Sequence, residues 1–347
     1  MNRPWTFTRK LGLMAASVGA LILGMPGGSA FAQGAPLTNI TFNLDFTVLG
    51  RYAPWYVALA KGYYKDAGLN VKIVPGQGTA QAIQALESGL AQFSFSDVTS
   101  LVVASANGTA HAKFVMINYQ KPPYAIFSLN PGANVTTPAQ LSGLEIGTGA
   151  GSFTPKVIRG FMKEKGLNPD SVKFVNIDGA ARVGMLLSGK VPAIETFIFG
   201  QAGIAHSVAA GQQLSTLFLA NEGLQLYANG LLVKDDYLKR NPDLVRRFVK
   251  ASLMGWHDAL ENPAEAAKLQ TQYIPGLSPA SVVAEMKVVA ELSVTADTKA
   301  HGLGSIDPAT MERSVAFVEK YAGLQGKPPA TETLYTTAFL PKAPVLP

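Results

Sequence analysis

The amino-acid sequence predicts an α/β protein built from two lobes. The chain has 347 residues, too many for one ordinary hydrophobic core. From residue 36 to about residue 129, short apolar segments alternate with segments of helical periodicity, an order typical of a parallel sheet covered by helices. The same order of strand, glycine and helix starts again near residue 130. Ligands of such folds bind at the carboxyl ends of strands, so we expect a site there.

The first 32 residues have the features of a signal peptide. Three basic residues are followed by an apolar stretch at 11–23 and then by Ala30-Phe-Ala32, which has the small-x-small form of a cleavage site. The apolar stretch is too short for a transmembrane helix. We therefore expect cleavage after Ala32 and a mature protein that is free in the periplasm, not inserted in the membrane.

The composition excludes several classes of site. The chain contains no cysteine, which rules out disulfides, thiolate metal sites and cysteine nucleophiles. The four histidines are each more than 40 residues from the next, so no pair has the spacing of metal ligands. Removing the three basic residues of the leader from the 29 leaves 26 basic against 23 acidic residues, with no basic run. We expect no metal, no cofactor and no nucleic-acid partner.

The stretch 42–69 carries the strongest local signal. Residues 42–46 are expected to form a strand, residues 50–53 a turn, and Pro54 the first position of a helix that Gly68 ends. Aromatic faces beside the free N–H groups of a helix start suit a small polar or planar ligand, although such side chains also fill cores. Four aromatic residues fall within eleven positions here: Phe46, Tyr52, Trp55 and Tyr56.

The remaining elements follow the same order along the chain. Strands are expected at 71–74, 93–95, 114–118, 125–129, 144–148, 172–176, near 193–197 and at 226–233. Helices are expected at 82–86, 98–106, after 149–155, at 180–187 and at 201–210. From residue 235 onward the pattern is mostly helical, with Pro242, Pro263 and Pro279 each opening a helix.

Acidic residues stand at several of the expected strand ends. A carboxylate there can accept hydrogen bonds from amino or ring N–H groups of a ligand, and Asp97 or Asp178 can instead cap a helix. Asp45 and Glu195 are harder to explain as caps, because each stands within strand-like sequence beside an aromatic residue. Arg51 is the one cation of the first loop, where it can hold an anionic ligand or point to water.

Five segments resemble the NMT1/THI5-like solute-binding proteins of ABC importers. The segments are Leu44-Asp-Phe, Arg51 to Ala58, Lys61 to Val71, Glu87 to Phe93 and Gly189 to Ala193, and the resemblance runs from about residue 38 to 260. It implies a type II periplasmic binding fold, with two α/β lobes, two crossover segments and a ligand cleft between the lobes. The implied division gives one lobe residues 36–129 and 225–347 and the other residues 130–224, with crossovers near 124–130 and 224–233.

The resemblance also implies a set of ligand contacts. It assigns this role to the loop from Arg51 to Tyr56, to Ser96 and Asp97, to Gly151, Ser152 and Phe153, and to Glu195. Pro192 replaces the aspartate usual in the family's G-K-V-D-A turn. Pyrimidine synthases of the family carry a histidine where this chain has Tyr52, and they need cysteines that it lacks. Tyr52 and the absence of cysteine favour binding over catalysis.

The leading hypothesis is therefore a monomeric periplasmic binding protein that delivers a ligand to the transmembrane subunits of an ABC permease. Stacking on Tyr52, Trp55 or Tyr56, with an acidic residue fixing the orientation, favours a planar nitrogenous ligand such as a thiamine-precursor pyrimidine. Three alternatives stay open: a sulfonate, taurine or nitrate-type anion held by helix N-termini and Arg51, an enzyme of pyrimidine metabolism on the same fold, and a sensory role.

Overall fold

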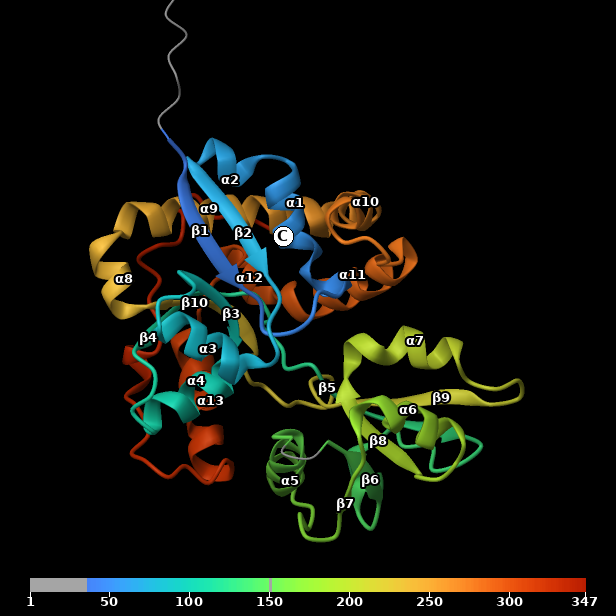
Figure 1. Cartoon of the computed structure of the whole chain (residues 1–347). Coiled ribbons are helices and arrows are strands. Elements are labelled where there is room, and N and C mark those ends of the chain that lie inside the picture. The colour runs from blue at the N-terminus through green and yellow to red at the C-terminus, as the bar shows by residue number, and fades with distance from the viewer. Residues whose placement is uncertain (1–35, 150–151) are drawn as a thin grey trace, which may run out of the picture. The chain divides into compact units, whose positions relative to one another are not determined.

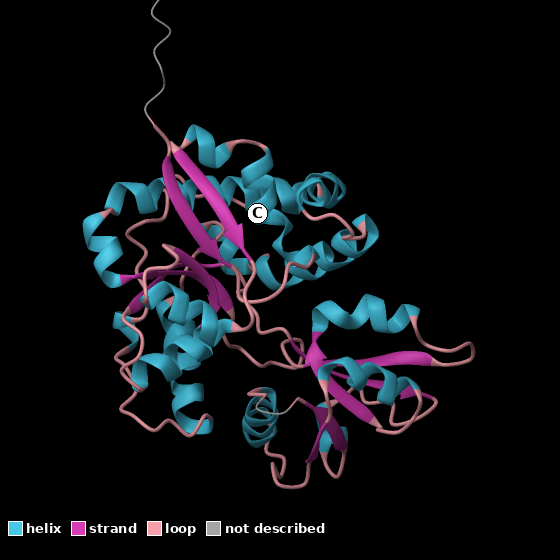
Figure 2. Cartoon of the chain, viewed as in Figure 1, coloured by secondary structure: helices cyan, strands magenta, loops and turns pink. Residues whose placement is uncertain are grey.

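The computed structural model describes residues 36–149 and 152–347, which form two five-stranded sheets with helices around them (Figures 1 and 2). The expected signal peptide and Gly151 lie outside the described residues. The first sheet has the order β2-β1-β3-β10-β4 and the second the order β7-β6-β8-β5-β9. The first contains β1 (Thr38–Asn43), β2 (Leu69–Val74), β3 (Phe93–Asp97), β4 (Ala112–Ile117) and β10 (Asn229–Lys234). The second contains β5 (Tyr124–Asn130), β6 (Glu145–Thr148), β7 (Lys173–Asn176), β8 (Ala193–Phe197) and β9 (Gln213–Phe218).

Each sheet is parallel except where the chain crosses between lobes. Strand β1 pairs in parallel with β2 and β3, and β6 pairs in parallel with β7 and β8. Strand β10 is antiparallel to both of its neighbours, and so is β5. The predicted two-lobed α/β architecture is confirmed, and its ligand site is expected where the parallel strands end.

The crossings lie earlier in the chain than expected. Residues 124–129 were expected in the first lobe, but β5 pairs with β8 and β9 and so belongs to the second sheet. The chain leaves the first sheet after Ile117 and returns to it at Asn229. The two crossings are joined by backbone hydrogen bonds, since Tyr119 donates to Asn229 at 2.9 Å and Ala228 donates to Tyr119 at 3.1 Å.

Helices cover the sheets, and many of them begin at a proline. Pro242, Pro263 and Pro279 stand at helix starts as predicted, where the missing N–H leaves no hydrogen bond unmade. With the first sheet go α1 (Ala53–Ala60), α2 (Tyr63–Asp66), α3 (Thr79–Glu87), α4 (Val98–Ala106) and α8 (Asp235–Arg240). The C-terminal part adds α9 (Pro242–Glu261), α10 (Pro263–Tyr273), α11 (Pro279–Ser293), α12 (Ala296–His301) and α13 (Pro308–Tyr321). With the second sheet go α5 (Thr154–Glu164), α6 (Gly179–Leu187) and α7 (Gln201–His206). Short 3-10 turns are η1 (Gly50–Tyr52), η2 (Pro138–Leu141), η3 (Ile198–Gly200) and η4 (Thr331–Thr333).

Helix α1 lies in the core of the first lobe, where it contacts both α9 and α10. Its approach to α9 requires glycine, because a Cβ atom on Gly255 would lie 2.5 Å from the carbonyl oxygen of Pro54. The Trp55 ring is 4.6 Å from the Phe42 ring and 5.6 Å from the Trp256 ring, centroid to centroid. This packing fixes the loop that precedes α1, which leads to the cleft.

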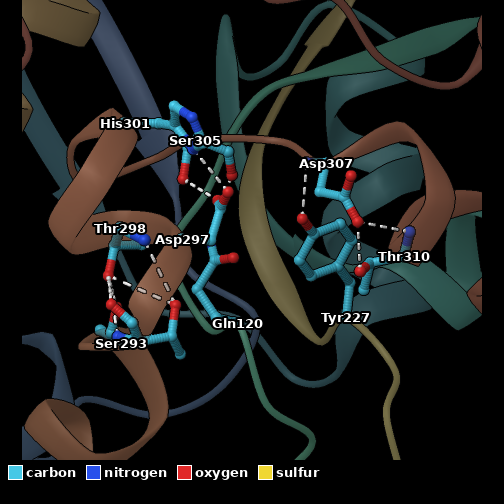
Figure 3. A network of polar contacts seen from close by, with 10 residues as sticks. Gln120, Tyr227, Ser293, Asp297, Thr298, His301, Ser305, Asp307 and Thr310 are labelled. Carbon is cyan, nitrogen blue, oxygen red and sulfur yellow. Dashed lines mark hydrogen bonds and ion pairs between the residues drawn. The ribbon is translucent and has the colours of Figure 1, made fainter.

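A polar network joins the crossings to the C-terminal helices (Figure 3). The Gln120 side chain donates from Nε2 to the carbonyl oxygens of Ile117, at 2.8 Å, and Ser305, at 3.0 Å. The Tyr227 hydroxyl accepts from the backbone N–H of Asp307 at 2.7 Å. The Asp307 carboxylate caps α13 by accepting from the backbone N–H of Thr310 at 2.9 Å and from its hydroxyl at 2.6 Å. The first-lobe ends of both crossings are therefore tied to the segment that starts α13.

Replacing Asp307 with alanine is expected to lower the free energy of unfolding by about 1 kcal/mol, the usual effect of losing an N-cap. The Thr310 hydrogen bonds hold the pKa of Asp307 below its usual value. Its stabilising contribution is therefore complete above about pH 4 and is lost as the pH falls toward the lowered pKa. Urea unfolding at pH 7 and pH 3 measures both effects. Asp170→Ala is the control, since the side chain of Asp170 is 87% exposed, and equal losses in the two variants would contradict the prediction.

Candidate functional site

Two adjoining cavities lie between the lobes, and both are lined by Asp45, Thr79 and Phe197. The first cavity, of about 690 Å³, lies between α3 and α4 on one side and the start of α5 and end of β8 on the other. The second cavity, of about 640 Å³, lies between the loop after β1, the region of η3 and α7, and α11. Together they form the candidate ligand-binding cleft.

The loops that follow β1 and β2 bring the first lobe's side chains to this cleft. Gly76 lies so close to β1 that a Cβ atom on it would be 2.0 Å from the carbonyl oxygen of Leu44. The backbone N–H of Gly78 donates to the carbonyl oxygen of Asp45 at 2.8 Å. Gly78 has φ +125°, a conformation that favours glycine, and α3 begins directly after it. Asp45 and the start of α3 are thereby fixed side by side.

Asp45 is buried and accepts hydrogen bonds from three side chains. One Arg51 guanidinium nitrogen lies 2.8 Å from Oδ2, the Tyr52 hydroxyl 2.6 Å from Oδ1, and Asn229 Nδ2 3.2 Å from Oδ2. Burial lowers the pKa of Arg51, but the Asp45 carboxylate and the Tyr52 and Tyr119 hydroxyls together raise it by more, so the net shift is upward and the guanidinium stays charged. The cation and the acid expected to hold a ligand are thus paired with each other, while both still line the second cavity.

Arg51 also contacts the second lobe. Its guanidinium carbon lies 4.4 Å from the centre of the Tyr52 ring and 5.5 Å from that of Phe199 in η3. The Phe199 ring in turn lies 5.6 Å from the ring of Tyr119 in the first crossing. Phe199 is therefore held by a cation–π contact and an aromatic contact that join the lobes at the wall of the second cavity.

The prediction that Tyr52, Trp55 and Tyr56 form a stacking surface for the ligand is wrong. Their exposed fractions are 0%, 0% and 4%, and none of the three lines either cavity. The reason is that α1 is apolar on all sides and packs between α9 and α10, which turns these rings into the core. Phe46 is the exception in this loop, because it is 48% exposed and lines the second cavity.

Ser96 and Asp97, expected after the strand at 93–95, fall within β3, and only Asp97 lines the cleft. Its carboxylate caps α4, accepting from the backbone N–H and the hydroxyl of Ser100, each at 2.8 Å. Burial raises the pKa of Asp97, and the hydrogen bonds from Ser100 oppose that shift. Ser96 is fully buried and shares a hydrogen bond with Ser94 at 2.8 Å, so it does not line either cavity.

In the second lobe, Ser152 and Phe153 line the first cavity as expected at the start of α5. Glu195 is 3% exposed and lies behind them rather than in the cavity lining. It accepts from Thr148 Oγ1 at 2.7 Å and from Ser152 Oγ at 3.2 Å, and Arg182 Nη1 lies 3.4 Å away. Glu195 is therefore placed to position Ser152.

The sequence and the fold of this chain are similar to those of known proteins. A family model described as "NMT1/THI5 like" matches residues 50–266, more than half of the chain. The chain belongs to the NMT1/THI5-like family. The similar proteins include riboflavin-binding protein RibY of Chloroflexus aurantiacus, which is 29% identical over 331 residues and covers 91% of each chain. They also include the yeast 4-amino-5-hydroxymethyl-2-methylpyrimidine phosphate synthase THI13, which is 25% identical and covers 69% of this chain and 72% of its own.

Solved structures agree on the fold of this NMT1/THI5-like chain. The alkanesulfonate-binding protein SsuA of Xanthomonas axonopodis, bound to MOPS, aligns with a TM-score of 0.65 and 15% identity, over 87% of this chain and all of its own. The type II periplasmic binding fold implied by the sequence is thereby confirmed. At this identity the likeness concerns the fold alone.

Several lining residues of this NMT1/THI5-like cleft were missed from the sequence. Phe197 ends β8 as Asp97 ends β3, so the strand-end rule that singled out Asp97 could have found it. Glu285 lies in the middle of α11, where no local pattern marks a site. Other missed residues include Thr79 at the start of α3, Tyr124 and Asn229 at the starts of β5 and β10, and Phe199 in η3.

The charges of the cleft are one-sided. Among the described residues that line the two cavities, the acids are Asp45, Glu87, Asp97 and Glu285, and Arg51 is the only cation. Because Arg51 is paired with Asp45 and Glu87 with Lys234, the remaining charge of the lining is carried by Asp97 and Glu285 and is negative. Such a lining repels anions and suits neutral or cationic groups.

Two further features concern the described residues as a whole. Across 36–149 and 152–347, no three histidine, aspartate or glutamate side chains are grouped so that they could hold a metal ion. Within the same ranges, none of the helices has both the length and the apolarity needed to cross a bilayer.

Proposed function

We propose that this protein is the solute-binding component of an ABC importer that captures a small planar nitrogenous heterocycle and delivers it to the permease from the periplasm. The observation that carries the proposal is the lining of the cleft, where exposed aromatic rings stand beside acidic and amide acceptors and the one cation is paired. The family and the periplasmic binding fold support the same role.

Aromatic rings from both lobes supply the stacking surface. Phe46 of the first lobe is 48% exposed and Phe197 of the second is 43% exposed, and both line the second cavity. Tyr124 packs edge-on against Phe197 at 5.8 Å and faces the first cavity, as does Phe153. A flat ring that enters between the lobes would contact rings on both sides, which couples binding to closure.

Polar groups around these rings fit a ligand rich in N–H donors. Asp97 and the side-chain oxygen of Asn229 are acceptors in the first cavity, and Thr79 and Ser152 carry hydroxyls there. Thiamine-precursor pyrimidines and flavins both present N–H groups at the edge of a flat ring. The name of THI13 points to the first class and that of RibY to the second.

An anionic ligand fits this cleft less well. A sulfonate would need free helix N-termini or an unpaired cation. The N-terminus of α4 already carries the Asp97 carboxylate, and Arg51 is neutralised by Asp45. The uncapped start of α3 lies beside Asp45, which leaves the start of α5 as the free helix N-terminus of the cleft. The MOPS bound to SsuA is therefore a poor guide to the ligand of this chain.

Binding without turnover is part of the proposal. The synthases in the family are represented by THI13, whereas RibY, which covers more of this chain, is named as a binding protein. Tyr52 is buried against Asp45 and Arg51, so it offers no reactive group to the cleft. A ligand recovered unchanged after denaturation of the complex supports this role, and a converted product contradicts it.

Calorimetry with the mature protein tests the assignment. The probes are riboflavin, 4-amino-5-hydroxymethyl-2-methylpyrimidine and MOPS. We expect a heterocycle to bind and MOPS not to bind, and Phe197→Ala to weaken the heterocycle by about tenfold through lost stacking. Tyr273→Ala is the matched control, since Tyr273 is an exposed aromatic residue outside both cavities. Binding of MOPS alone would reject the proposal.

A further inference from the structure

Part of the second cavity is built from segments of the chain outside the family match. The match spans residues 50–266, whereas Asp45, Phe46 and Leu49 precede it and Ser281, Ala284 and Glu285 follow it. The last three belong to α11, which contacts both η3 and α7 of the second lobe. One wall of the cleft therefore comes from a helix that the family model does not include.

Helix α11 is held rigidly at this wall. A Cβ atom on Gly50 would lie 2.7 Å from the Cα atom of Val282, so the backbones of η1 and α11 are in direct contact. Glu285 Oε2 accepts from the backbone N–H of Arg51 at 2.9 Å. The position of the Glu285 carboxylate is thus set by a packed backbone contact and a hydrogen bond.

The second cavity is shaped for a flat apolar group. Small residues, Gly200, Ala202 and Gly203 of the second lobe and Ser281 and Ala284 of α11, line its sides and leave its volume free. Its apolar surfaces are Phe46, Leu49, Phe197 and Phe199. A fused aromatic ring could fill this space of about 640 Å³ between the rings and the small residues.

Glu285 is the acceptor of the second cavity that can still form a hydrogen bond with a ligand. Asp45 already accepts from Arg51, Tyr52 and Asn229, and the Arg51 guanidinium is occupied by Asp45. Glu285 accepts from the backbone N–H groups of Arg51 and Gly50, and because a carboxylate has about four acceptor sites it can still accept from a ligand. A carboxylate in a partly buried apolar cavity favours an N–H donor strongly.

We infer that the second cavity is a separate subsite that receives a fused aromatic ring bearing an N–H group, and that Glu285 determines specificity by accepting that N–H. The inference rests on the proposed function, because it assumes that the cleft takes a nitrogenous heterocycle. It makes α11 the helix that sets the affinity for fused-ring ligands.

Two variants of α11 and two matched controls test this subsite by calorimetry. Ala284→Phe fills the cavity and is compared with Ala280→Phe, an exposed position of the same helix that lines neither cavity. Glu285→Gln is compared with the exposed Glu319→Gln. Glutamine would use its one oxygen for Arg51 and present an amide N–H to the ligand, so the acceptor is lost without a change of shape.

The probes are riboflavin, riboflavin methylated at its imide nitrogen, and the single-ring pyrimidine. We expect Ala284→Phe to weaken riboflavin by at least about tenfold while the pyrimidine binds as it does to the wild type. Glu285→Gln should weaken riboflavin by about tenfold and leave the methylated form unchanged, and both controls should match the wild type. Thermal melts establish that the variants are folded.

The outcomes distinguish failure of the subsite from failure of the proposed function. If the wild type binds none of the probes, the proposed function fails. If the wild type binds riboflavin and both α11 variants match their controls, the subsite is rejected and the proposed function stands. Binding of the pyrimidine without riboflavin also rejects the subsite, because a cavity that admits no fused ring has no such role.

Discussion

Replacing Arg51 with leucine is expected to lower the free energy of unfolding by about 3–5 kcal/mol, the range for breaking a buried ion pair from one side. The change leaves the Asp45 carboxylate buried, with only Tyr52 and Asn229 as donors. Burial of a carboxylate without its counter-charge is the source of the loss, rather than the missing attraction itself. The cation–π contact with Phe199 is lost as well.

Guanidinium unfolding at pH 7 measures this effect. Arg246→Leu is the matched control, because the Arg246–Asp243 pair is on the surface and is worth less than about 1 kcal/mol. The double variant with Asp45→Leu and Arg51→Leu removes both charges and should recover part of the stability. A single-variant loss no larger than that of Arg246→Leu would show that the pair is not buried in solution.

Replacing Trp55 with alanine is expected to cost about 3–5 kcal/mol, as for a large aromatic residue removed from a packed core. The Trp55 ring is fully buried and packs on Phe42, Phe95 and Trp256, so the deletion opens a cavity that the neighbours cannot fill. The ring lines neither cavity of the cleft. The affinity of the folded fraction for its ligand should therefore change little.

Unfolding and calorimetry on the same samples separate the two roles of this position. Trp55→Phe should recover much of the stability, and Leu90→Ala, at a side chain 75% exposed, should have almost no effect. A Trp55→Ala protein that stays as stable as the wild type but loses ligand affinity would restore the stacking role that the sequence suggested.

The fold was predictable because its signals are local. Prolines at positions 54, 242, 263 and 279 each open a helix, and glycines after the helices end them. The first crossing was predicted a few residues too late in the chain. The sequence of β5 is apolar enough for a strand of either lobe, and only its pairing with β8 and β9 assigns it to the second sheet. Pairing is a long-range property that one segment does not encode.

The candidate site was harder to predict, for two physical reasons. The loop with Tyr52, Trp55 and Tyr56 has aromatic residues in a helix that is apolar all round, and that pattern marks a core helix rather than a binding face. Glu285 was missed because it reaches the cleft only through the packing of α11 against η1. The strand-end acids were more informative, since Asp45 and Asp97 do line the cleft.

The place of β10 in the first sheet has a consequence for biosynthesis. Strand β4 pairs with β10, which lies more than 100 residues later in the chain, whereas all five strands of the second sheet fall between residues 124 and 218. The second sheet is therefore complete before the first one can close. Until β10 arrives, β3 and β4 keep open edges of the kind that recruit other chains. A substitution that slows folding of the second lobe should thus lower the yield of soluble protein through aggregation of the first.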